Sequence, residues 1–314
     1  HADRADADPR ALRAGGGGDR VDDLERETKP VGDRTAVRVR ALIGAVAQEL
    51  RDEIAARAVD LDAVEAGTDR VGRAAAELGD DPRQLVGARI TAIRRHGKYL
   101  LVDTDTPDTL LVHLGMTGRF LIVGEATPRA THTHLVLWLD DGRELRFVDA
   151  RRFGQSDVVA RAHEGEHPAL KVLGPDPLVH GIDSSLLYAR SRGRKSTLKP
   201  FVLDQSVLAG VGNIYASEAL WKAQLRPPTR AHRLTVDSAR RLAEAILEVL
   251  HNALDKGGTS LRDFVNADGA EGENADYLWV YGRAGESCLR CKTPIRRAVH
   301  QGRATYYCPT CQTP

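Results

Sequence analysis

Four cysteines lie within the last 27 residues, and the chain has no others. They form two Cys-x2-Cys pairs, "CLRC" and "CPTC", with sixteen residues between the pairs. Two such pairs supply four thiolates in a tetrahedron, which is the ligand set of structural zinc. The alternative is four ordinary buried or redox-active cysteines. Because protein fills every ligand position, we expect one closed, non-catalytic Zn²⁺ site made of Cys288, Cys291, Cys308 and Cys311.

The segment between the two cysteine pairs is basic and aromatic. A metal-braced hairpin with such side chains is typical of a nucleic-acid-binding finger. The alternative is a hairpin tip whose charges serve only solubility. The residues concerned are Arg296, Arg297, His300, Arg303, Tyr306 and Tyr307.

The stretch "LAGVGNIYASEAL" places two glycines directly before an apolar helical pattern that begins near Asn213. Glycine lets the backbone approach another group closely, and a helix start offers free N–H groups and a positive dipole end. This combination predicts a phosphate-binding helix start, with helix packing as the alternative. The preceding "GRKSTLKP" adds Arg194, Lys195 and Lys199 to the same region.

Three further loops carry side chains that could act on a nucleic acid. Lys98 follows a glycine beside a strand in "RRHGKYLLV", where a lysine is ordinarily a surface residue. Met116 lies between glycines in "HLGMTG", and Phe153 follows Arg151 in "DARRFG". An apolar side chain at a loop tip is costly in water unless it inserts into a partner, and core packing is the alternative.

These residues need a scaffold, and the hydrophobic pattern predicts an α+β one. Alternating β-branched runs over residues 86–160 predict an antiparallel β-sandwich, with a hairpin turn at Gly142. Residues 35–58 have the period of a flanking helix. Four further helical patterns fill residues 183–256, and "LGPDPLVHG" reads as a linker between the two regions.

We therefore divide the chain into four segments. They are a disordered or linker segment 1–34, a helix plus β-sandwich 35–172, a helical domain 173–276 and a zinc-finger hairpin 277–314. Residues 1–80 hold 13 Lys and Arg against 18 Asp and Glu, whereas the remainder holds 32 against 26. The later part is thus basic, which favours a polyanionic partner. No apolar run is long enough to span a membrane, and we expect a cytoplasmic, nucleoid-associated bacterial monomer.

Seven motifs occur together and in one order: "HGKYL", "HLGMTG", "DARRFG", "LDQSVLAGVGNIYASEALW", "KGGTSLRDF", "VYGRAGESC" and the cysteine pairs. In this combination the chain resembles the formamidopyrimidine-DNA glycosylase family, whose members contain a helix–two-turn–helix domain. The likeness extends from about residue 85 to 312. It implies a β-sandwich, a helical domain and a zinc finger, with damaged duplex DNA held between the domains and the damaged base flipped out.

The resemblance also implies an activity and residue roles. The activity is a DNA glycosylase with AP lyase activity that removes oxidised purines, such as 8-oxoguanine and formamidopyrimidines. Lys98 and Arg303 match catalytic positions, where Lys98 contacts phosphate and assists strand cleavage, and Arg303 grips the backbone together with Asn213. Met116, Arg151 and Phe153 match the side chains that fill the gap in the duplex, and His132 and Lys195 match further DNA contacts.

The sequence departs from the family at one place. Family members begin with Pro-Glu, whose proline amine is the nucleophile, and no Pro-Glu pair occurs in this chain. The prolines before Lys98 are Pro9, Pro30 and Pro82, and each is internal and therefore has no free amine. We consider three explanations: a start that is not the natural one, a member that binds damaged DNA without cleaving it, or a replacement nucleophile. A zinc-finger regulator that reads base sequence is a weaker alternative, because no recognition-helix pattern is visible.

Overall fold

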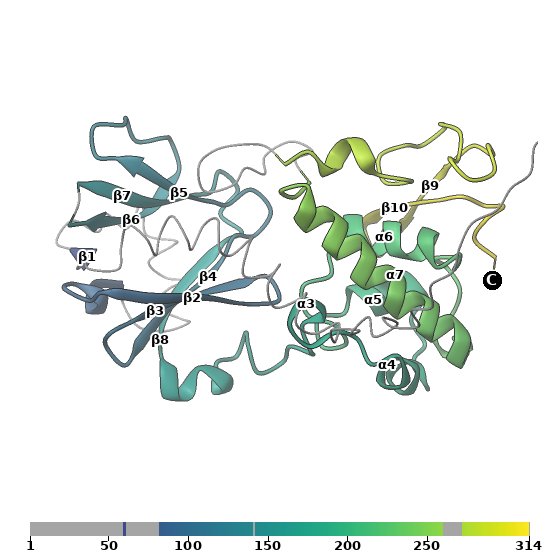
Figure 1. The fold of residues 1–314 in the computed structure, drawn as a ribbon, viewed down its shortest axis with the longest axis horizontal. Coiled ribbons are helices and arrows are strands. Elements are labelled where there is room, and N and C mark those ends of the chain that lie inside the picture. The colour runs from purple at the N-terminus through teal and green to yellow at the C-terminus, as the bar shows by residue number, and fades with distance from the viewer. Residues whose placement is uncertain (1–58, 61–81, 141, 260–271, 314) are drawn as a thin grey trace, which may run out of the picture.

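The computed structural model describes residues 59–60, 82–140, 142–259 and 272–313. Figure 1 shows two lobes side by side, with strands in one lobe and helices in the other. A short β-hairpin near the C-terminus lies on the helical lobe. This arrangement confirms the predicted α+β class.

The first lobe is a sandwich of two antiparallel sheets. One sheet has the order β2-β3-β4-β8 and the other the order β1-β6-β7-β5. The strands are β1 (Val59–Asp60), β2 (Ile90–His96), β3 (Tyr99–Thr104), β4 (Asp108–His113), β5 (Arg119–Gly124), β6 (Thr133–Leu139), β7 (Arg143–Val148) and β8 (Gln155–Ala160). The short 3₁₀ helices η1 (Pro82–Leu85) and η2 (Arg161–Glu166) flank the strands.

Alternating apolar residues make the core between the two sheets. Leu110 and Val112 of β4 face Leu135 and Leu137 of β6, together with Phe147 of β7, and all five are buried. Because side chains alternate along a strand, this period-two pattern fixes which face of each sheet packs inward. The loops at the strand ends are therefore held in place by a rigid sandwich.

In its described residues, the second lobe contains five α-helices. They are α3 (Pro177–His180), α4 (Ser184–Ser191), α5 (Leu198–Leu203), α6 (Asn213–Lys222) and α7 (Val236–Asp255). The long helix α7 begins at a capping box in which Thr235 and Ser238 satisfy each other's backbone N–H groups. Its apolar face, including Leu242, Ile246 and Leu250, packs against α4 and α6.

The short helix α3 corrects one prediction. The segment with Pro175 and Pro177 was expected to be a linker, but it forms a helical turn that starts at Pro177. Proline is favoured at the first helical position, and the Asp176 carboxylate accepts a hydrogen bond from the Leu178 N–H. The turn therefore forms because its N-terminal N–H groups have a local partner.

The C-terminal hairpin consists of β9 (Arg296–His300) and β10 (Arg303–Tyr307), paired in register through a Gln301–Gly302 turn. Strand β10 packs against α6 (Figure 1). The flanking helix expected at 35–58 lies outside the described residues, and the boundaries between the four segments remain predictions. Within the described part of the chain, no helix has the length and apolar character required to cross a membrane.

Candidate nucleic-acid interface

The turn between β2 and β3 brings Lys98 to the helical lobe. Gly97, with φ +60°, packs so closely on the loop before α6 that a Cβ there would lie 3.0 Å from the Ala209 Cβ and 3.2 Å from the Gly210 nitrogen. Only glycine fits this position without strain. As a result the Lys98 Nζ lies 3.9 Å from where a Cβ of Gly212 would be, beside the start of α6.

The buried Asp176 carboxylate fixes this turn to the helical lobe. It accepts a bidentate pair of hydrogen bonds from Arg95 at 2.6 and 3.0 Å, and a third from the Gly97 N–H at 2.7 Å. The same group caps α3 through Leu178. One carboxylate thus joins the β2–β3 turn, which carries Lys98, to the first helix of the second lobe.

The Gln205 side chain braces the loop before α6 through two hydrogen bonds. Its Oε1 accepts from the Gly210 N–H at 2.9 Å, and its Nε2 donates to the Val211 carbonyl at 3.1 Å. Asn213 is the first residue of α6, as predicted, and its Nδ2 donates to the Tyr281 hydroxyl at 3.1 Å. The Asn213 Oδ1 is buried and has no hydrogen-bond partner among the described residues.

Positive charge gathers where these elements meet. Arg303, at the start of β10, is exposed, and its charge acts on Lys98. Burial among protein atoms, followed by repulsion from Arg303, lowers the pKa of Lys98, although solvent still reaches its side chain. Burial and the charge of Lys98 likewise lower the pKa of His113. A cluster of cations with mutually unfavourable fields is a site that an anion stabilises.

Met116 and Phe153 project from two adjacent loops at the end of the sandwich. They are 68% and 53% exposed, so core packing is excluded for both. The loops touch so closely that a Cβ at Gly115 would lie 2.6 Å from the Gly154 nitrogen. The Arg151 guanidinium lies 4.8 Å from the Phe153 ring centroid, which groups Arg151 with this apolar pair.

Buried Asp149 ties the two loops together. It accepts hydrogen bonds from Thr117 Oγ1, from the Gly154 N–H at 2.7 Å and from the Arg151 N–H at 3.2 Å. Burial acts to raise the pKa of Asp149, but these hydrogen bonds outweigh it and hold the pKa below its ordinary value. A charged carboxylate therefore fixes the loops that carry Met116 and Phe153.

His132 and Lys195 are the remaining two predicted contact residues, and they lie in different parts of the structure. His132 is exposed with φ 70°, and its carbonyl accepts from the Asp149 N–H at 3.0 Å, which places it beside the two loops. Lys195 is exposed in the loop before α5. Among the described residues, no hydrogen bond or ion pair joins its side chain to Lys98, Asn213 or Arg303.

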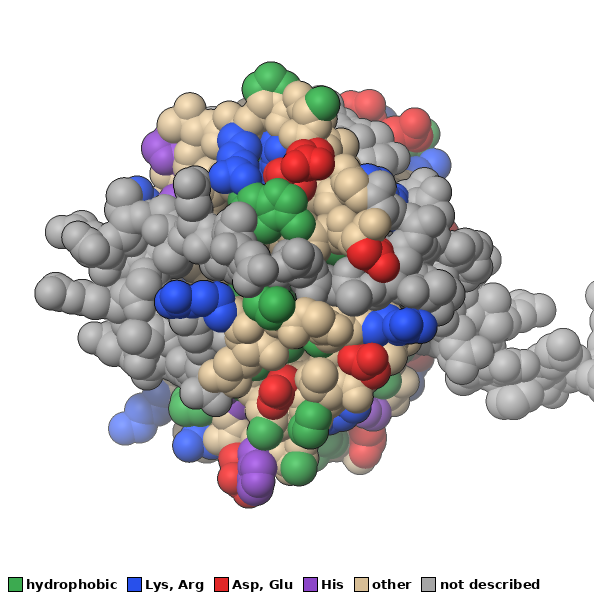
Figure 2. Space-filling model, turned by 90° about the vertical axis from the view of Figure 1, so that its left-hand side faces the viewer, with side chains coloured by type: hydrophobic (Ala, Val, Ile, Leu, Met, Phe, Trp, Pro, Cys, Tyr) green, Lys and Arg blue, Asp and Glu red, His purple; other side chains and the backbone are tan. Residues whose placement is uncertain are grey.

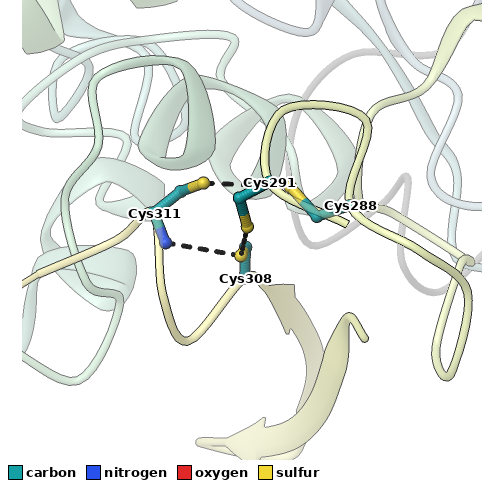
Figure 3. A group of neighbouring side chains, drawn as sticks. All are labelled: Cys288, Cys291, Cys308 and Cys311. Carbon is teal, nitrogen blue, oxygen red and sulfur yellow. Dashed lines mark hydrogen bonds between the residues drawn. The ribbon is translucent and has the colours of Figure 1, made fainter. Parts of the chain in front are cut away.

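The four cysteines come together as predicted (Figure 3). Their sulfur atoms lie within 4.8 Å of one another, with Cys288 and Cys311 3.9 Å apart and Cys291 and Cys308 3.4 Å apart. Zinc–sulfur bonds of about 2.3 Å in a tetrahedron place sulfurs about 3.8 Å apart. The donor set and its spacing therefore fit a zinc ion.

The finger shares its core with helix α6. Trp221, on the last turn of that helix, is buried with Cys288, Cys308, Val280 and Ile295. The Trp221 ring also stacks on Trp279 at 5.3 Å between centroids. The metal site and the helix that begins at Asn213 are thus parts of one packed unit.

Several structural residues escape sequence reasoning. Glu218 of α6 is buried and accepts three backbone hydrogen bonds, from Trp279, Val280 and Tyr281 at 2.7, 3.0 and 2.7 Å. This carboxylate holds Tyr281 beside Asn213. Asp149 and Asp176 were missed as well. Each lies in a stretch that the sequence analysis quoted, but nothing local in the sequence identifies its distant partners.

At the far end of the sandwich, the described side chains carry charges of both signs. Figure 2 looks at this end, where described basic, acidic and apolar side chains are interspersed. The described surface at this end thus differs from the junction between the lobes, where Lys98 and Arg303 bring positive charge together.

Comparisons with known proteins agree with this geometry. Three family models match: the formamidopyrimidine-DNA glycosylase N-terminal domain at residues 43–156, the corresponding H2TH domain at 173–265, and a zinc finger found in FPG and IleRS at 285–314. A formamidopyrimidine-DNA glycosylase of Herpetosiphon aurantiacus is 48% identical over 226 residues, which cover 71% of this chain and 81% of that protein.

Solved structures of the same family share the fold. Lactococcus lactis Fpg, in complex with N7-benzyl-Fapy-dG DNA, superposes with a TM-score of 0.76 at 30% identity, covering 87% of this chain and 98% of that one. MutM (FPG) of Thermus thermophilus gives 0.74 at 37% identity, with 86% and 97% covered. Taken with the sandwich, the helical lobe and the four-cysteine finger, these matches show that the chain belongs to the formamidopyrimidine-DNA glycosylase family.

Proposed function

We propose that this chain is a base-excision-repair DNA glycosylase with AP lyase activity, which removes oxidised purines from duplex DNA. The observation that carries the proposal is the meeting of Lys98, the start of α6 at Asn213, and the field of Arg303 at the junction of the two lobes. Three separate segments of the chain contribute to this cluster. The damaged-base DNA bound by the Lactococcus lactis relative supports the choice of ligand.

In this proposal the phosphate backbone binds at the basic cluster. Asn213 and Arg303 grip phosphates on either side of the lesion, and Lys98 contacts the reacting nucleotide, so Lys98 and Arg303 are the catalytic pair. Such contacts are independent of base sequence and depend on salt, as a protein that searches for lesions requires. His132 and Lys195 extend the phosphate contacts along the duplex.

The apolar loops act on the base stack. Met116 and Phe153, with Arg151 beside them, enter the space that the flipped nucleotide leaves. Their exposure in the DNA-free chain is unfavourable in water, and insertion into the duplex offsets part of the few kcal/mol that unstacking costs. Because Asp149 holds both loops, little conformational entropy is lost on insertion.

One zinc ion braces the finger. Cys288, Cys291, Cys308 and Cys311 hold it, and its binding energy stabilises the fold around β9 and β10. Arg303 is then held in position before DNA arrives. Because the four cysteines fill all of its ligand positions, the ion takes no part in the chemistry.

The phosphate-contacting residues Lys98, Asn213 and Arg303 (the clamp) and the exposed apolar residues Met116 and Phe153 (the wedge) also fit one alternative function. In that alternative the chain recognises damaged DNA with the same clamp and wedge but forms no covalent intermediate. Both functions predict binding, and they differ only in chemistry. A test must therefore record base release, covalent capture and affinity separately.

Borohydride trapping on an 8-oxoguanine duplex makes this separation. The glycosylase and lyase proposal predicts free 8-oxoguanine and a covalent protein–DNA adduct, with neither product on undamaged duplex. Base release without an adduct would exclude the proposed lyase activity and support the glycosylase activity alone. Tight, salt-dependent binding with neither product would assign the damaged-DNA-binding alternative, and no binding at all would refute both.

A further inference from the structure

Lys199 is the largest fully buried side chain of the chain's described part, with 1% of its surface exposed. It is the second residue of α5, near the positive end of that helix. A cation is unfavourable both in a protein interior and at a helix N-terminus. A charged lysine at this position therefore lowers the stability of the fold unless specific hydrogen bonds offset the loss.

Those hydrogen bonds connect helix α6, which begins at Asn213, to strand β10, which begins at Arg303. The Lys199 Nζ donates to the Ser217 Oγ of α6 at 2.9 Å and to the Ala304 carbonyl of β10 at 2.7 Å. The Ser217 hydroxyl in turn donates to the Asn213 carbonyl at 3.1 Å. An unbroken chain of hydrogen bonds thus runs from Asn213 through Lys199 to the residue that follows Arg303.

We propose that Lys199 is a positioning residue that locks the finger strand β10 to the first turn of α6, so that Asn213 and Arg303 bind DNA phosphates as one rigid unit. The inference rests on the proposed function for its DNA readout, but the link itself is a property of the free protein. Lys199 is too deeply buried to contact DNA, and it acts through its two neighbours.

The charge around Lys199 gives the link a pH dependence. Burial, followed by repulsion from Arg303, lowers the pKa of Lys199 to about 7. His300 on β9 is the other titratable group that interacts with it, and burial and then Lys199 lower the pKa of His300. Helix α6 offers only the Ser217 hydroxyl, and in the ranges that the structure describes Lys199 has no carboxylate partner.

The sign of the effect follows from linkage. A phosphate bound by Arg303 reduces the positive field on Lys199 and raises its pKa, so DNA binding is accompanied by proton uptake at Lys199. Affinity is then highest below pH 7 and falls as pH rises above it. The fall is limited to about tenfold per pH unit, because one proton is involved.

The first test uses the free, zinc-loaded protein. Lys199→Met removes both hydrogen bonds, and we expect faster hydrogen–deuterium exchange in residues 296–307, with the sandwich unchanged. Lys195→Met is the matched control, since it removes an exposed lysine four residues away and leaves the hairpin protected as in the wild type. Equal hairpin exchange in Lys199→Met and wild type would overturn the proposal.

The second test measures affinity for a duplex with an abasic-site analogue between pH 6 and 8.5. The affinity of the wild type should fall as pH rises above 7. Lys199→Met should bind about tenfold more weakly at pH 6.5, the scale of one charged hydrogen bond, and its affinity should fall less steeply with pH, with the remaining slope due to Lys98 and His113. Lys195→Met should lose affinity equally at every pH. A slope that is the same in Lys199→Met and wild type would overturn the proposal.

A third variant separates folding from positioning. Lys199→Gln keeps a donor for the Ala304 carbonyl but carries no charge, so it should retain part of the hairpin protection and show the same reduced pH slope as Lys199→Met. It replaces the methionine variant if that variant does not fold. If wild type binds no duplex at any pH, the proposed function fails, and hydrogen exchange alone decides whether Lys199 locks the hairpin.

Discussion

Replacing Asp176 by alanine should both destabilise the protein and weaken DNA binding. The substitution removes two hydrogen bonds from Arg95 and one from the Gly97 N–H, and it also removes the cap on Leu178. Breaking a buried ion pair costs about 4 kcal/mol, because the guanidinium is left without its partner. Loss of the cap adds about 1 kcal/mol. The expected loss of unfolding free energy is therefore about 5 kcal/mol.

Urea denaturation followed by tryptophan fluorescence measures this loss. With a dependence of about 3 kcal/mol per molar urea, the midpoint should fall by about 1.7 M. Asp183→Ala is the control, because Asp183 caps α4 through Ser185 in the same way but is exposed and forms no ion pair with any residue that the structure describes. If the two variants shifted the midpoint equally, Asp176 would be only a helix cap, and the reasoning about the junction of the lobes would be refuted.

Three other predictions concern the clamp, the finger and the loops. Asn213→Ala should weaken binding to damaged and undamaged duplexes by the same factor in a fluorescence titration, and a loss confined to damaged DNA would contradict its role as a phosphate contact. Removing the metal with a chelator should abolish DNA binding and change the fluorescence of Trp221, and unchanged affinity would exclude a role for the finger. Because the pKa of Asp149 is lower in the folded protein, its carboxylate should stabilise the fold above the ordinary pKa of about 4. This stabilisation should be lost as pH falls through the lower pKa of the folded state. Asp149→Asn should therefore make the melting temperature depend less on pH in acid solution. An unchanged pH dependence would show that Asp149 is not a source of that stability.

Local patterns in the sequence predicted the elements well. The expected hairpin turn at Gly142 joins β6, which ends at Leu139, to β7, which begins at Arg143. The helical patterns expected up to residue 256 also end close to the observed position, since α7 ends at Asp255 and is followed by Gly257 with φ +68°. These features depend on turn chemistry and helical period, which neighbouring residues determine.

Contacts between distant segments could not be predicted in the same way. Arg95 and Asp176 are 81 residues apart in the chain, and either could be an ordinary surface charge. The bond between Asn213 and Tyr281 spans 68 residues. Lys199 reads as one more basic residue in a basic stretch, and only tertiary structure reveals that it is buried. The resemblance to a family supplied the grouping of site residues, but not the groups that hold them.

The backbone contact between Gly97 and Gly210 has an evolutionary consequence. Neither residue offers a side chain to a ligand, but any added side chain at Gly97 would push the β2–β3 turn away from α6, and Gly210 has φ +93°. Selection for repair would therefore act on these two positions as strictly as on Lys98 itself. In a library of single substitutions screened for survival under oxidative stress, both glycines should tolerate no replacement.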